Sequence, residues 1–89
     1  MKNEVYLTHP NFGLLFRICL TDDSQELFTT LYAQRLFFLV TLGSDSVTFE
    51  PVSRTNARIL LEGRLRSLKR AGKTQEYQQL QLIHQQTFS

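Results

Sequence analysis

The chain has few of the residues on which disulfide-bonded, membrane-spanning or disordered proteins depend. Its 89 residues include one cysteine, two prolines, four glycines and no tryptophan. Because Cys19 stands alone, no internal disulfide can form, which favours a reducing, cytoplasmic location. The longest unbroken apolar run covers residues 36–40, far short of the roughly 20 residues that a membrane-spanning helix needs. With 42% hydrophobic residues, the composition is typical of one small globular domain.

Side chains that carry enzyme chemistry are also scarce. His9, Cys19 and His84 are the soft metal ligands, and no two of them stand at the spacing of a zinc site. The four glycines are scattered along the chain, so no phosphate-binding loop is expected. So short a chain does not easily enclose a deep pocket. We therefore expect a non-enzymatic protein without a metal or cofactor, in which His84 is a packing residue.

The net charge of +2 conceals two halves of opposite sign. Residues 1–53 carry three basic and six acidic side chains, a net charge of −3, whereas residues 54–89 carry seven basic and two acidic ones, a net charge of +5. This division argues against a uniformly basic nucleic-acid-binding protein.

The first 53 residues have the pattern of short strands separated by turns. We expect strands over residues 4–7, 13–20, 27–32, 36–41 and 47–50, the last of them ended by Pro51. Alternation over residues 13–20 predicts one face that carries Leu14, Phe16, Ile18 and Leu20. One long helix over residues 25–40 is the alternative to the third and fourth strands. Aromatic and β-branched runs without a 3.6-residue period favour the two strands.

The period changes after residue 53. Leucine and alanine at helical spacing predict a helix over residues 54–71, with Ser53 or Thr55 as its N-cap and Gly72 at its end. A second helix is expected over residues 75–87, and the short connection predicts an antiparallel hairpin. Glu62 and Arg66 stand at i,i+4 spacing and are expected to pair. The predicted fold class is α+β, with a five-stranded Tudor-like or SH3-like barrel in residues 1–53 and a helical hairpin in residues 54–89.

Aromatic residues are concentrated in the predicted barrel, which contains eight of the ten. We expect some to form an exposed patch, and such patches mark interaction sites. Around the third connection, aromatic, amide, guanidinium and aliphatic groups are mixed as in protein-binding hot spots; these residues are Tyr32, Gln34, Arg35, Leu36 and Phe38. One face of the fourth strand must enter the core. The other must be covered by the helices or by a partner.

A second candidate surface lies on the first helix. Its basic residues opposite the leucine stripe are Arg58, Arg66, Lys69 and Arg70. They can meet phosphates, an acidic partner or only water. The alternative function is therefore that of a Tudor- or SH3-like protein that binds nucleic acid or the ribosome through this helix.

The residues themselves resemble a known family. Residues 27–40, Leu-Phe-Thr-Thr-Leu-Tyr-Ala-Gln-Arg-Leu-Phe-Phe-Leu-Val, are similar to the signature stretch of the PipX family of cyanobacterial PII-interacting proteins. Further matching segments extend the resemblance over essentially the whole chain; they include His9-Pro10, residues 12–15, residues 17–20, residues 49–51, residues 53–55 and residues 76–78. Phe16 departs from the pattern, because the family is expected to have tyrosine there.

The resemblance implies a Tudor-like domain followed by two helices, in a monomeric adaptor of nitrogen and carbon signalling. It implies that the trimeric PII protein sequesters the adaptor at low 2-oxoglutarate, and that the adaptor coactivates the transcription activator NtcA at high 2-oxoglutarate. The effector binds the partners and not the adaptor, and nucleic acid is contacted only indirectly. RNA polymerase or another regulator is a further candidate partner for the C-terminal helices. The implied interface comprises Tyr6, Tyr32, Gln34, Arg35, Leu36 and Phe38, together with Glu4 and Phe12.

Overall fold

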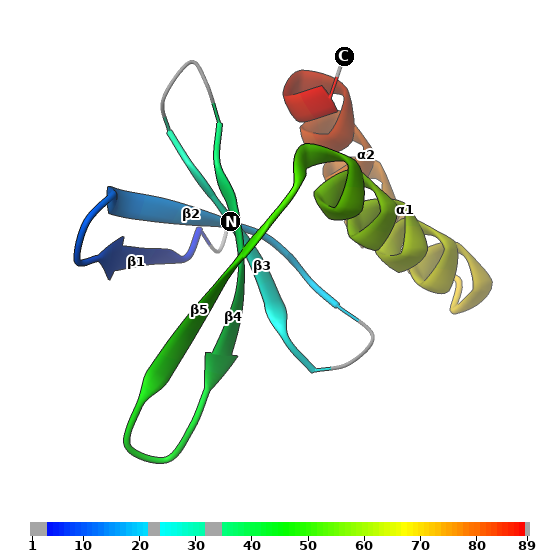
Figure 1. Cartoon of the computed structure of the whole chain (residues 1–89). Helices are drawn as coiled ribbons and strands as arrows, with labels where there is room; N and C mark the ends of the chain where they lie inside the picture. The colour runs from blue at the N-terminus through cyan, green and yellow to red at the C-terminus, as the bar shows by residue number, and fades with distance from the viewer. Residues whose placement is uncertain (1–3, 22–23, 32–34, 89) are drawn as a thin grey trace.

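The structure, a computed structural model, describes residues 4–21, 24–31 and 35–88, and it folds into five strands followed by two helices (Figure 1). The elements are β1 (Tyr6–His9), β2 (Gly13–Leu20), β3 (Glu26–Thr30), β4 (Phe37–Leu42), β5 (Val47–Val52), α1 (Arg54–Arg70) and α2 (Thr74–Phe88). The predicted α+β class is confirmed, and two separate strands stand where one long helix was the alternative.

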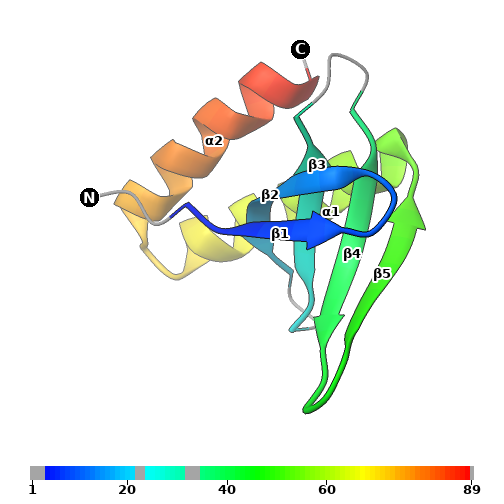
Figure 2. The ribbon, with the colours of Figure 1, turned by 90° about the vertical axis from the view of Figure 1, so that its left-hand side faces the viewer.

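The five strands form one antiparallel sheet in which each strand pairs with the next along the chain. The sheet curls into a half-barrel, and Figure 2 shows β1 lying across β3 and β4. The His9 and Phe49 ring centroids, from the two edge strands, are 4.7 Å apart. The register of β2 against β3 shifts between Arg17 and Cys19, and such a bulge increases the bend of a strand.

Several details of the strand predictions were wrong. The first strand covers Tyr6–His9 and not residues 4–7, and the third ends at Thr30 and not at residue 32. The alternation expected over the whole of β2 is interrupted near its end, where Cys19 pairs with Leu27 and Leu20 pairs with Glu26, one position out of step with the residues before them. The shift in register at Ile18 breaks the alternation, so Ile18 and Cys19 are both buried. Pro51 does not end β5, which continues to Val52. β5 is an edge strand, where proline is tolerated because one side of the backbone needs no ladder hydrogen bond.

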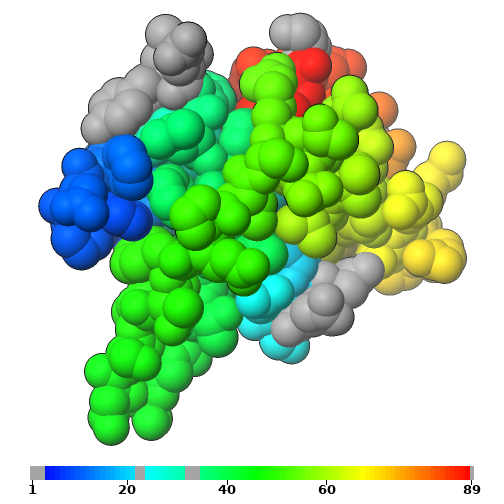
Figure 3. Space-filling model, viewed as in Figure 1, coloured from blue at the N-terminus to red at the C-terminus, as the bar shows by residue number. Residues whose placement is uncertain are grey.

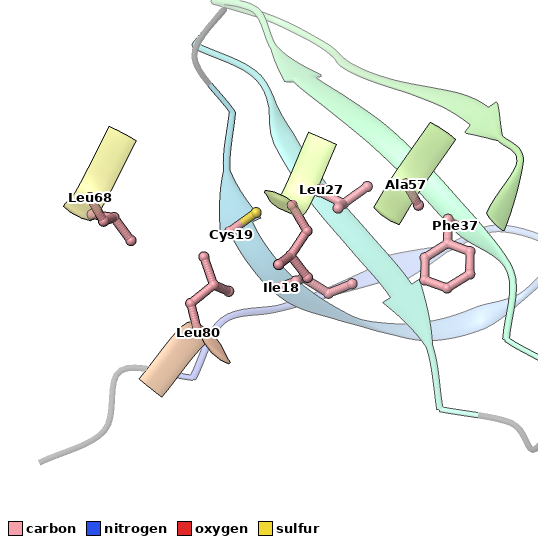
Figure 4. Packing of buried hydrophobic residues seen from close by; sticks show 8 residues of the cluster. Ile18, Cys19, Leu27, Phe37, Ala57, Leu68 and Leu80 are labelled. Carbon is pink, nitrogen blue, oxygen red and sulfur yellow. The ribbon is translucent and has the colours of Figure 1, made fainter. Parts of the chain in front are cut away.

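Two hydrophobic clusters lie on opposite faces of the sheet. The first fills the space between the sheet and the helices (Figure 4); its buried members are Ile18, Cys19, Leu27, Phe37, Ala57, Leu61, Leu68 and Leu80. The second lies inside the curl and consists of Leu15, Phe28, Phe38 and Val40. Phe37 and Phe38 thus belong to different clusters, and the helices cover the outer face of β4. The first cluster is shared between the sheet and the helices. The division into two domains at residue 53, in which each part would fold on its own, therefore remains a prediction.

The helices pack as an antiparallel pair. Ser53 is the N-cap of α1 and accepts a hydrogen bond from the Asn56 amide, and Gly72, with φ of 72°, follows the end of the helix. The start of α1 meets the end of α2, since the Arg54 guanidinium donates to the Thr87 carbonyl at 3.0 Å and lies 5.1 Å from the centroid of the Phe88 ring. Phe88 in turn stacks on Phe37, with 5.4 Å between ring centroids.

Glu62 does not form the ion pair with Arg66 that their i,i+4 spacing predicted. Its carboxylate lies 3.0 Å from His84 Nε2 across the two helices. His84 is half-buried and contacts the Phe88 ring. The packing role expected of His84 is thus combined with a polar contact that joins α1 to α2.

Candidate protein-binding surface

Tyr6 and Glu4 lie together at the free edge of the sheet. The Tyr6 hydroxyl donates to Glu4 Oε1 at 3.1 Å, and the Tyr6 side chain is 43% exposed. This hydrogen bond, partial desolvation and the negative charge of Glu4 raise the pKa of the Tyr6 phenol. Phe16 stands opposite Tyr6, with 5.6 Å between ring centroids. Phe16, which stands where the family is expected to have tyrosine, therefore packs an apolar ring against Tyr6.

Arg35 and Leu36 lead into β4 from a connection whose Tyr32 and Gln34 fall outside the described residues. Leu36 is 43% exposed, and Arg35 is half-buried. Arg35 Nη1 donates to the Thr30 carbonyl at 3.2 Å, which fixes the guanidinium close to the end of β3. Both residues are thus reachable from solvent and held by the sheet.

A threonine pair that the sequence analysis missed fixes this connection. The Leu36 amide donates to Thr30 Oγ1 at 3.0 Å, and the Thr30 amide donates to the Leu36 carbonyl at 3.0 Å. The Thr29 hydroxyl donates to the same carbonyl at 3.0 Å. Thr29 and Thr30 are almost completely buried, so the backbone of Leu36 is held by groups shielded from water. The only signal in the sequence was two adjacent threonines at the end of a strand.

The register of the sheet places these two groups at the same end of the molecule. Tyr6 pairs with Phe16, and Phe16 pairs with Thr29, whose hydroxyl binds Leu36. Two strand spacings of about 4.8 Å separate Tyr6 from Thr29 along the sheet, roughly 10 Å in all. The backbones of Tyr6 and Leu36 therefore lie in neighbouring cross-strand rows, a separation within the span of an ordinary interface.

Phe38 and Phe12 belong to an aromatic cluster around His9. Phe38 is only 2% exposed, and its ring centroid lies 5.1 Å from His9 and 5.6 Å from Phe12. Phe12 is half-buried and also contacts His9, at 4.9 Å. In this structure Phe38 supports the surface from beneath, whereas Phe12 reaches it in part.

His9 fixes the turn between β1 and β2. Its Nδ1 accepts hydrogen bonds from the Asn11 amide at 3.0 Å and from the Phe12 amide at 3.2 Å. Since Nδ1 is an acceptor here, the ring proton is on Nε2. From the sequence, His9 was considered only as a metal ligand, and no partner for it stood at the spacing of a zinc site. Its side chain in fact orders the backbone that carries Phe12.

The four basic residues singled out on α1 are all exposed but do not form one surface. Arg58 borders a small hollow with Arg54, Thr55 and Phe88, and Lys69 borders another beside Tyr77. At about 100° per residue, Arg66 and Arg70 lie farther round the helix, on the side away from its buried residues. Only Arg66 and Arg70 therefore belong to the outer face of α1.

Within the described ranges, no three histidine, cysteine, aspartate or glutamate side chains are placed to hold a metal ion. Over the same ranges, no helix combines the length and apolar character needed to cross a bilayer.

Comparison with known families gives one match that covers nearly the whole chain. The model of the PipX family, described as PII-interacting protein X, matches residues 3–88. No curated protein matches the chain.

Proposed function

The chain belongs to the PipX family of PII-interacting proteins, and we propose from this membership that it is a non-enzymatic signalling adaptor with two competing partners. One partner is the trimeric PII protein, which sequesters the adaptor at low 2-oxoglutarate. The other is the transcription activator NtcA, which the adaptor coactivates at high 2-oxoglutarate. The family match over residues 3–88 is the observation that carries the proposal.

The arrangement at the end of the sheet supports a shared interface. Tyr6 and Leu36 are exposed apolar side chains beside the polar groups of Glu4 and Arg35. Such a mixture is characteristic of interface hot spots. We propose these four residues, with Tyr32, Gln34 and Phe12, as the contacts for both partners. Phe38 acts by supporting them.

Competition explains how an adaptor without its own effector site can respond to a metabolite. If one surface binds either partner but not both, each partner lowers the pool of adaptor available to the other. A tenfold change in the affinity of either partner, about 1.4 kcal/mol, then redistributes the adaptor. The 2-oxoglutarate signal is thus sensed by the partners, in the cytoplasm, and transmitted by occupancy.

Binding measurements under two nucleotide conditions test the proposal. The wild-type chain should be retained by immobilised PII with ADP and released with ATP plus 2-oxoglutarate, whereas retention by NtcA should increase with 2-oxoglutarate. Arg35→Ala and Leu36→Ala should weaken both complexes at least tenfold, because truncated hot-spot residues cost about 2 kcal/mol or more. Thr48→Ala, at an exposed position on β5, is the matched control. Loss of one complex with the other unaffected would reject a shared surface.

We also propose that the basic residues of α1 provide a second contact, with a different partner. A partner bound at the end of the sheet would leave four basic side chains of α1 exposed, namely Arg58, Arg66, Lys69 and Arg70. The partner proposed for this contact is RNA polymerase or a further regulator, because a transcription activator complex would bring either one close to α1. This contact does not require the PII and NtcA surface to be assigned correctly.

A further inference from the structure

We propose that the outer face of α1, defined as Ile59, Gly63, Arg66 and Arg70, is a docking surface for an acidic α-helix of a partner protein. This face belongs to the helical half of the chain, which carries the net charge of +5. The surface assigned to PII and NtcA lies instead at the end of the sheet. The new proposal rests on the second contact proposed above for α1 and narrows it to one face and one kind of partner, but it can fail or succeed independently of the PII and NtcA surface.

The first observation is an exposed isoleucine on a helix whose apolar side is otherwise covered. Ala57, Leu61 and Leu68 are the buried residues of α1, whereas Ile59 is 53% exposed. The four residues of the outer face stand at i, i+4, i+7 and i+11, which places them within an arc of about 60° on the opposite side of the helix. Yellow-green atoms of α1 form part of the surface in Figure 3.

The second observation is a glycine that the described chain does not require. Gly63 is in the middle of α1 and is not among the residues with positive φ. A Cβ added there would meet, among the described atoms, only the Arg66 guanidinium, at 3.7 Å. Glycine in a helix interior costs about 1 kcal/mol relative to alanine. What glycine provides in return is space for the close approach of another backbone.

The third observation is the charge around this apolar centre. Arg66 and Arg70 follow Ile59 and Gly63 along this face, and Glu62, the one acidic residue of α1, contacts His84 of α2. Carboxylates on a partner helix would pair with the two guanidinium groups, which bind carboxylates in a bidentate geometry. An amphipathic helix would also cover Ile59 and lie along the i, i+4, i+7 row. Nucleic-acid phosphates would engage the arginines but leave Ile59 uncovered, so we favour the acidic helix.

The test uses the full chain and a defined set of probes. A displayed library of amphipathic helical peptides, with polar positions varied among Glu, Gln and Lys, is selected against the wild-type protein. Selection against the Ile59→Glu variant removes peptides that bind elsewhere. The selected peptides should be enriched in Glu. Their affinity should fall as salt is raised, since exposed charge pairs are screened.

Single variants then distinguish docking on this face from general electrostatic attraction. Gly63→Ala should weaken the selected peptides about tenfold, because an added methyl group overpacks a close helix contact. Ile59→Ser and the double change Arg66→Gln, Arg70→Gln should weaken them comparably. Lys73→Gln, an exposed basic residue in the connection between α1 and α2, is the control for loss of a positive charge and should change affinity less than about twofold. Circular dichroism will show that the Gly63→Ala variant is folded.

Three results would overturn the proposal. The first is a selected set without enrichment in Glu. The second is full affinity in both Gly63→Ala and Ile59→Ser. The third is tighter binding of a 20-base-pair DNA duplex than of any peptide, dependent on the two arginines alone, which would establish a nucleic-acid surface instead.

Discussion

Replacing Thr30 with valine removes the hydroxyl that holds the start of β4 while leaving a side chain of similar shape. Thr30 is fully buried, and its Oγ1 accepts the Leu36 amide at 3.0 Å. In the variant this amide loses its partner in a site that water reaches poorly. A part-buried donor left unsatisfied costs about 1–3 kcal/mol. Thr30→Ser keeps the oxygen and should retain most of that stabilisation.

The expected loss can be measured in two ways. For a chain of 60–100 residues, each kcal/mol changes Tm by about 4–8 °C, so Thr30→Val should lower Tm by at least 4 °C. The second measurement is amide hydrogen exchange, in which the Leu36 amide should exchange about tenfold faster or more, while amides of α1 show a smaller change. Thr48→Val, exposed on β5, is the control and should change stability by less than about 0.5 kcal/mol.

The outcome also bears on binding. If the Leu36 backbone must be held for partners to bind, Thr30→Val should weaken binding to both PII and NtcA. Thr30→Ser should then retain most of the wild-type affinity. An unchanged Tm together with an unchanged Leu36 exchange rate would refute the reasoning, because the hydrogen bond would then contribute nothing measurable.

Three further changes test other contacts. His9→Phe keeps an aromatic ring but removes the Nδ1 acceptor of two backbone amides, so the free energy of unfolding in urea should fall by about 1–3 kcal/mol, whereas no loss would exclude this role. The Tyr6 phenol should titrate above its ordinary pKa of 10.0, and its bond to Glu4 should be lost only as pH rises through that raised pKa. In Glu4→Ala the pKa should return towards 10.0, as followed by the absorbance of tyrosinate against a Tyr6→Phe control. Gly63→Ala should raise the free energy of unfolding by about 0.5–1 kcal/mol, and a destabilised variant would show that the helix cannot accept a Cβ at that position.

Local patterns in the sequence predicted the elements of the fold but not the way the sheet bends. The helical period, the Ser53 cap and the Gly72 turn depend on residues close together in the chain, and they were predicted correctly. The interrupted alternation of β2 was not, because it depends on a bulge between Arg17 and Cys19 that has no local signature. The continuation of β5 past Pro51 depends on its place at the edge of the sheet, which is a property of the whole topology.

The candidate surface was predictable to a similar extent. Exposure of Tyr6 and Leu36 follows from an excess of large side chains in a small barrel. The burial of Phe38 depends on β1 crossing the curl, and no period within residues 36–40 reveals that. The threonine and histidine contacts join side chains to backbone groups whose positions are fixed only after folding. Pattern analysis therefore cannot detect such contacts, even though they order the backbone of the candidate surface.

The edge strand β5 also affects how the molecule behaves at high concentration. A free strand edge is a template for pairing with the edge of another molecule. In β5 the row of backbone donors is interrupted by Pro51, and Glu50 beside it is charged and exposed. Leu42 and Val47, at the tip of the β4–β5 hairpin that projects from the body in Figure 3, are exposed apolar side chains that would otherwise favour such pairing. Pro51 thus removes one donor from the free edge of β5, which disfavours edge-to-edge pairing between molecules in concentrated solution.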